Sequence, residues 1–217
     1  MKFGAETERG KGMLGAAIHG FLLAFGLILP LGVQNVFVFN QGAAGRKLRR
    51  ALPAVLTAAV GDTILIMLAV LGVSVLVLSW SWLKIVLFAA GAVFMTYIGW
   101  TIWRDASAPA SAGPSGLPAK KQVVFALSVT FLNPHAILDT IGVIGTSSLG
   151  YPGGEKWAFT LATILVSWIW FFSLALAGKI IGSLDRGGAL LRGINRVSAL
   201  IVWAMAMYML YTGLVVN

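Results

Sequence analysis

Residues 52–78 read LPAVLTAAVGDTILIMLAVLGVSVLVL and carry one charged side chain, Asp62. An apolar run of this length can cross the hydrocarbon core of a bilayer, about 30 Å thick, as a helix. The rest of the 217-residue chain is similar, because 59% of it is hydrophobic and only 11% is charged, with a mean hydropathy of +0.90. A soluble domain carries about 25% charged residues. The sequence therefore predicts an all-α integral membrane protein and excludes a globular enzyme.

Apolar stretches bounded by charged or turn residues predict six transmembrane helices. Tryptophans lie at several of their ends, as expected for aromatic belts at the membrane interfaces. The predicted spans are Leu14–Phe39, Leu52–Leu78, Trp82–Trp103, Gln122–Ser147, Trp157–Ile181 and Ile194–Val216.

The longest connection, residues 105–121, is rich in Ala, Ser, Pro and Gly and divides the chain into two halves. It has little to bury, so it is predicted to be a flexible linker. The expected organisation is a polar N-terminal tail (1–13), a first three-helix repeat (14–104), this linker and a second three-helix repeat (122–217). An odd number of spans in each half forces opposite orientations. The prediction is thus a 3+3 inverted repeat, as in many secondary transporters.

The net charge of +9 and the isoelectric point near 10.3 are explained by the position of the basic residues. By the positive-inside rule, the side of the membrane with more Lys and Arg faces the cytoplasm, so both termini are predicted to lie outside a bacterial inner membrane. The basic excess then reflects topology and contact with lipid headgroups, and binding of nucleic acid is not expected. The predicted cytoplasmic group is Arg46, Lys47, Arg49, Arg50, Arg104, Lys120, Lys121, Lys179, Arg186, Arg192 and Arg196.

Two acidic residues, Asp62 and Asp139, lie well inside predicted spans. A charged side chain at that depth costs at least about 2.5–3.5 kcal/mol on insertion scales and usually marks function. No Lys or Arg lies comparably deep in the predicted spans. The two carboxylates therefore suit a visiting cation, which could be a proton, a metal ion or the ammonium or guanidinium group of a substrate.

Pro30 and Pro134 lie in the middle of the first and fourth spans and are predicted to kink or break both helices. A broken span exposes backbone amides that attract a carboxylate and carbonyls that attract cations. Superposing Pro30 on Pro134 places Asn35 on Asp139, which supports the internal repeat. Neighbouring polar side chains could bind a polar ligand; they are Gln34, Asn35, Asn133 and Thr140.

His135 is a candidate proton relay, because imidazole titrates near neutral pH. A lone histidine beside two carboxylates gives too few ligands for a metal site, and the chain has no cysteine. No phosphate-binding loop or nucleophile–base motif is present, so neither a cofactor nor an enzymatic activity is expected. Active transport would then draw on an ion gradient. Trp168 and Trp170 are interpreted as packing residues, with stacking of one ring over a cationic substrate as the alternative.

Two segments resemble the LysE/ArgO family of basic amino-acid exporters, and its arginine-exporter branch most closely. Residues 30–42, PLGVQNVFVFNQG, are similar to the first-span signature of that family, and Asp62 is similar to its second-span aspartate. Residues 131–140, FLNPHAILDT, match the fourth-span Asn-Pro-x-x-x-x-Asp motif almost throughout. The similarity covers residues 13–217. One departure is Val33, where the family usually has proline.

The resemblance implies proton-driven export of L-arginine, with lysine or canavanine as further substrates, by antiport. It also implies that Asp62 and Asp139 form an acidic pair, with Gln34 and Asn35 in the polar signature. The residues alone leave two rivals open, an exporter of neutral amino acids such as threonine or homoserine and a divalent-cation transporter. The 26 glycines allow close helix packing and are compatible with a homo-oligomer.

Overall fold

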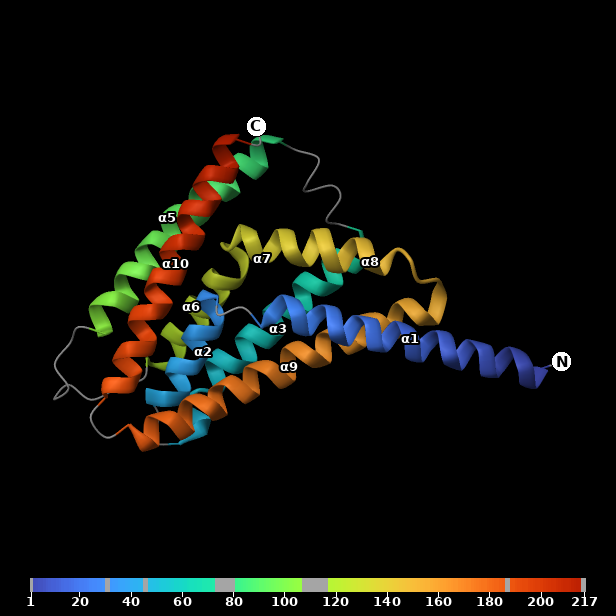
Figure 1. The fold of residues 1–217 in the computed structure, drawn as a ribbon, viewed down its shortest axis with the longest axis horizontal. Helices are drawn as coiled ribbons and strands as arrows, with labels where there is room; N and C mark the ends of the chain where they lie inside the picture. Colours follow the sequence, from blue (N-terminus) through green and yellow to red (C-terminus); the bar gives the residue numbers. More distant parts are fainter. Residues whose placement is uncertain are drawn as a thin grey trace.

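The computed structural model describes residues 2–29, 32–44, 47–72, 81–106, 117–185 and 188–215. These residues form helices joined by short connections, without a strand among them, which confirms the all-α prediction (Figure 1). In chain order the helices are α1 (Lys2–Ile28), α2 (Val33–Ala44), η1 (Leu48–Arg50), α3 (Leu52–Val70), α5 (Ser81–Ala106), α6 (Ala119–Phe131), α7 (Pro134–Asp139), η3 (Thr140–Gly145), α8 (Thr146–Ser148), α9 (Gly153–Leu184) and α10 (Ala189–Val215).

Within the described ranges, three helices are long and apolar enough to cross a membrane, and a bent pair makes up to four. The three are α3, α9 and residues Ala189–Tyr208 of α10, and they fall on the predicted second, fifth and sixth spans. The bent pair falls on the first span, and α5 and the α6–α8 segment fall on the third and fourth. Apolar spanning helices are thus present, while the number of six spans stays a prediction.

Both spans with a central proline are interrupted. The first is divided into α1, which ends at Ile28, and α2, which begins at Val33, with an angle of 79° between them. Pro30 itself lies outside the described residues. In the fourth span, α6 ends at Phe131 and α7 begins at Pro134. At the first position of a helix the missing N–H of proline has no partner to lose, so Pro134 starts a helix there.

The predicted polar tail is helical in the structure. Residues 2–28 form one continuous helix, and Figure 1 shows its N-terminal part projecting beyond the other helices. No proline interrupts this segment, so the helix can continue across the change from polar to apolar residues. The polar boundary near residue 13 was therefore a change of composition and not of secondary structure.

The described end of the predicted linker is anchored by two glutamine side chains. Buried Gln122 donates from Nε2 to the carbonyl oxygens of Leu117 (2.7 Å) and Arg50 (2.9 Å) and accepts from the Ala54 amide at Oε1 (3.1 Å). The Leu117 amide donates to Oε1 of Gln41 at 3.0 Å. These bonds hold the start of α6 against the end of α2 and the start of α3. Residues 107–116 of the linker lie outside the described residues.

Helices from the first half of the chain pack mainly against helices from the second half. The main partners are α1 and α2 with α9, α3 with α6, α9 and η3, and α5 with α10. Small residues allow the closest approach, because a Cβ at Gly42 or Gly178 would overlap the backbone at Ala175 or Phe39 across the α2–α9 contact. This contact holds α2, and the polar residues at its start, against α9.

Candidate functional site

Asp62 lies in α3, and its carboxylate binds donors from two other helices. Nε2 of Gln34 in α2 donates to Oδ1 (3.3 Å), and the hydroxyl of Ser167 in α9 donates to Oδ2 (2.8 Å). Asp62 is half-buried, whereas Ser167 is 3% exposed. A hydrogen bond to a charged acceptor is about twice as strong as one between neutral groups. The carboxylate therefore joins α2, α3 and α9 at one point.

The next residue of α3, Thr63, binds the next residue of α9. Its hydroxyl donates to the carbonyl oxygen of Ala59 in its own helix (2.7 Å) and accepts from the indole Nε1 of Trp168 (3.1 Å). Two consecutive residues of α3 thus bind two consecutive residues of α9. This arrangement sets both the rotation and the height of α9 on α3.

Asn35 bridges the break in the first span. Its Nδ2 donates to the carbonyl oxygen of Ile28 at the end of α1 (2.8 Å), and its Oδ1 accepts from Nε1 of Trp170 (3.2 Å). The last carbonyls of a helix lack partners within the helix, so this side chain caps α1 from α2. Phe25 of α1 meets the Trp170 ring edge-on, with centroids 5.9 Å apart. The two helix ends that flank the break are therefore tied to each other and to α9.

The second break has its own asparagine. Buried Asn133 precedes α7, and its Oδ1 accepts from the amide of Ala136 at 3.4 Å, which caps the start of the helix. Asp139 is half-buried at the end of α7, and Thr140 begins η3, a π-helix. Single π turns inside helices occur frequently at functional sites. Asn35 and Asn133 thus each bind a backbone group at a break, one at a helix end and one at a helix start.

Comparison with known proteins assigns the chain to a family. The model of the LysE type translocator family matches residues 25–213. The chain belongs to the LysE family. The match includes α2, α3 and the segment from α6 to α9, and so every residue of the two breaks and of the cluster around Asp62.

Curated relatives of this LysE-family protein are named as transporters. A Bacillus subtilis (strain 168) protein named "Putative amino-acid transporter YisU" is 53% identical over 203 residues, which are 94% of this chain and 92% of the relative. The "Arginine exporter protein ArgO" of Serratia proteamaculans (strain 568) is 36% identical over 209 residues, covering 93% of this chain and 98% of the relative. The protein of the same name from Salmonella paratyphi A is 34% identical over 200 residues, or 89% and 92%. No solved structure matches.

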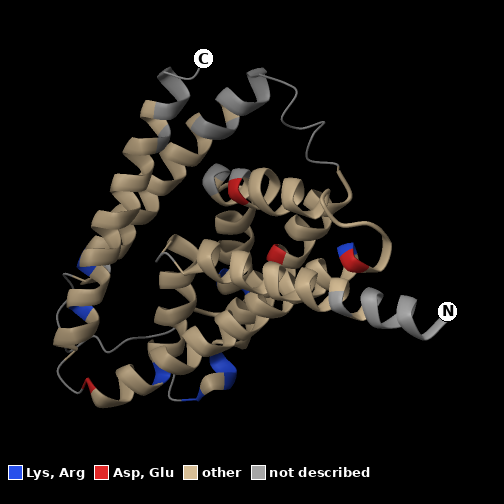
Figure 2. Ribbon diagram, turned by 45° about the vertical axis from the view of Figure 1, so that its right-hand side comes forward, with Lys and Arg blue, Asp and Glu red and all other residues tan. Residues whose placement is uncertain are grey.

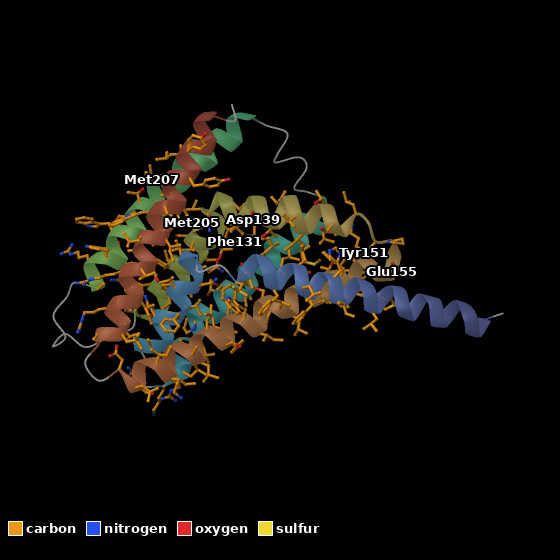
Figure 3. The ribbon with its side chains drawn as sticks, viewed as in Figure 1. Phe131, Asp139, Tyr151, Glu155, Met205 and Met207 are labelled. Carbon is orange, nitrogen blue, oxygen red and sulfur yellow. The ribbon has the colours of Figure 1, made fainter. Side chains whose placement is uncertain are left out.

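These matches identify a LysE-family amino-acid transporter, and not an enzyme. Of the predicted site residues, Gln34 and Asp62 are in direct contact, and Asn35 is tied to the same stretch of α9. Figure 3 shows Asp139 among the central helices, whereas Tyr151 and Glu155 lie at the end that holds the α8–α9 connection.

The remaining predicted residues belong to the second break. The segment from α6 to η3 contains three of them: Asn133 between α6 and α7, Asp139 at the end of α7 and Thr140 at the start of η3. The π-helix η3 packs against α3. Pro134 starts α7, but its side chain and that of His135 lie outside the described side chains. The proton-relay role of His135 is untested and stays a prediction.

Sequence reasoning missed the contribution of α9. Ser167 was not singled out, and the interpretation of Trp168 and Trp170 as packing residues was incomplete, because both indole N–H groups donate to polar side chains of α3 and α2. A signal was present in the sequence. The indole N–H groups of Trp168 and Trp170 lie close together in an apolar span and need acceptors, since lipid offers none.

Proposed function

We propose that this LysE-family transporter exports basic L-amino acids from the cytoplasm, arginine foremost, with lysine or canavanine as further substrates. The observation that carries the proposal is the cluster at Asp62, where Gln34 and Ser167 donate hydrogen bonds but bring no positive charge. A guanidinium or ammonium group would supply that charge inside the membrane, where an uncompensated carboxylate is costly. The relatives named arginine exporters, at 34% and 36% identity, favour the same substrate class.

The Asp62 carboxylate can accept further hydrogen bonds from a substrate cation. Each carboxylate oxygen has two acceptor sites, and one described bond at each oxygen of Asp62 leaves capacity for a bidentate guanidinium. In the proposed site Asp62 and Asp139 neutralise the substrate cation. Gln34, Asn35, Asn133 and Thr140 orient the substrate, and backbone amides at the starts of α2 and α7 bind its α-carboxylate.

We infer that transport proceeds by alternating access between two inverted three-span halves. Numbered as six spans, the main contacts join span 1 with 5, span 2 with 4 and with 5, and span 3 with 6. If the two halves are exchanged, spans 1, 2 and 3 take the places of spans 4, 5 and 6, and the reverse. The set of contacts is then unchanged, because the 1–5 contact becomes the 2–4 contact and the others map onto themselves. Two halves related by a pseudo-two-fold axis have this property.

Two hydrogen bonds support the same relation at the level of single residues. Asp62 with Ser167 and Thr63 with Trp168 are both 105 positions apart. The superposition of the two prolines implies nearly the same offset between the halves. That offset is 104, so each pair joins residues one position away from equivalence, as expected close to a pseudo-two-fold axis between the halves. In this proposal Asp62 lies at the centre of the transporter.

The proposed orientation places both termini outside the bacterial inner membrane. Figure 2 shows most Lys and Arg residues near the end of the molecule that holds η1, the C-terminal end of α9 and the start of α10. A cytoplasmic position of this end agrees with the positive-inside rule. The proton motive force would then drive export by antiport, with His135 as the proposed proton relay.

Efflux from proteoliposomes tests the substrate. Vesicles containing the purified protein and labelled arginine should lose arginine when a proton gradient is imposed, and external lysine or canavanine should exchange with it. Protein-free vesicles are the control. Release of threonine or homoserine without release of arginine would favour the neutral-amino-acid rival, and movement of divalent cations alone would favour the cation transporter. Either result would overturn the proposal.

A further inference from the structure

We propose that Ser167 is a positioning residue that favours arginine over lysine, by fixing the plane of the Asp62 carboxylate. The inference rests on the proposed function, because it concerns the same site. The hydroxyl of Ser167 makes the shorter of the two described bonds to this carboxylate, 2.8 Å against 3.3 Å for the amide of Gln34. Ser167 is 3% exposed, so solvent competes little for this bond.

Ser167 uses its hydroxyl differently from the other hydroxyl residues around it. A serine or threonine inside a helix commonly donates to the carbonyl oxygen four residues earlier in its own helix. Thr63, Thr130, Thr160 and Thr163 follow this rule, at 2.7 to 2.9 Å. The described bond of Ser167 instead leads to a carboxylate on another helix. Its donor is thus available to orient the charged group.

The position of Ser167 does not depend on its own hydrogen bond. The neighbouring Trp168 ties α9 to Thr63, and Trp170 ties α9 to Asn35. These bonds hold α9 in register with α2 and α3 when the hydroxyl is removed. Replacing Ser167 with alanine therefore deletes one donor from Asp62 and leaves the helix packing in place.

The plane of the carboxylate matters unequally for the two basic amino acids. A guanidinium is a planar fork that binds a carboxylate through two parallel hydrogen bonds, so its binding requires a particular orientation of the carboxylate plane. The ammonium group of lysine is a point charge with rotatable donors, and it tolerates a turned carboxylate. An Asp62 held mainly by the longer bond to Gln34 should lose arginine binding more than lysine binding.

The test compares Ser167→Ala and Ser167→Thr with the wild type in proteoliposomes, using arginine and lysine as separate substrates. Ser167→Ala should raise the KM for arginine by up to about tenfold, because a carboxylate that is free to turn has to be ordered when the guanidinium binds. The KM for lysine should change much less. Ser167→Thr retains the hydroxyl and should keep the arginine preference, even if its maximal rate is lower. Ser198→Ala, at a buried serine of α10, is the matched control and should keep the wild-type preference.

The outcomes separate this inference from the proposed function. Arginine export by the wild type with an unchanged arginine-to-lysine KM ratio in Ser167→Ala would overturn the positioning role and leave the proposed function standing. If Ser167→Ala weakens transport of both substrates equally, and Ser167→Thr does not restore it, Ser167 has a structural role and the positioning role is overturned. If the wild type transports neither basic amino acid, the proposed function fails, and the inference fails with it.

Discussion

Asp62 combines a negative charge with a pair of hydrogen bonds, and substitution can separate the two contributions. Asp62→Asn removes the charge but keeps a planar group of the same size between Gln34 and Ser167. We expect arginine efflux from proteoliposomes to fall by a factor of about 100 or more, because a desolvated partner of the guanidinium is lost. The melting temperature in detergent should change little, since the amide still offers an acceptor to Ser167.

Asp62→Glu is the matched control for this prediction. It retains the charge but moves it by one methylene, so it should retain part of the arginine efflux that Asp62→Asn loses. Wild-type efflux by Asp62→Asn would contradict the assignment of Asp62 to the substrate cation. Loss of folded protein would show instead that the carboxylate is needed for the α2–α3–α9 contact.

At the scale of elements, the contact between α2 and α9 depends on glycine. A Cβ at Gly178 would overlap the carbonyl group of Phe39, and backbone atoms cannot move aside as the end of a flexible side chain can. We therefore expect Gly178→Ala to lower the free energy of unfolding by about 1–3 kcal/mol, measured as a shift of the thermal or denaturant midpoint in detergent. The separation of the helices should also weaken the bonds from α9 to Asn35 and Asp62.

Gly193→Ala provides the matched control for the glycine prediction. Gly193 lies in α10 with nothing within 4 Å of an added Cβ. Alanine favours a helix over glycine by up to about 1 kcal/mol, so this substitution should leave stability unchanged or raise it. Equal destabilisation by both substitutions would contradict the close-packing argument.

The elements differ in how far sequence could predict them. Hydropathy located the cores of α3, α5, α9 and α10, because a long apolar run is visible in the sequence itself. Pro134 located the break between α6 and α7, because proline disrupts the helix before it. The π-helix η3 and the helical tail were not predicted, since neither has a local hydropathy signal.

The candidate site was predictable only in part. Polar residues inside spans, such as Gln34, Asn35 and Asp62, are conspicuous in the sequence because lipid excludes them. Their partner Ser167 was not, because a buried serine can bind its own helix and needs no other partner. Which helix a side chain faces depends on the rotation of packed helices, and that follows from tertiary contacts such as Thr63 with Trp168.

For the whole molecule, the proposed inverted topology places the first turns of α6 and α9 on opposite sides of the membrane. The chain has no cysteine, so single cysteines can report their side without a background. Lys120, in the first turn of α6, and Gly154, in the first turn of α9, are both exposed. In intact cells, a membrane-impermeant maleimide should label Gly154→Cys, whereas Lys120→Cys should react only after the membrane is permeabilised. Labelling of both sites in intact cells would contradict the predicted membrane crossing of the α6–α8 segment, which the inverted topology requires. The reverse pattern would retain this crossing and invert the proposed orientation.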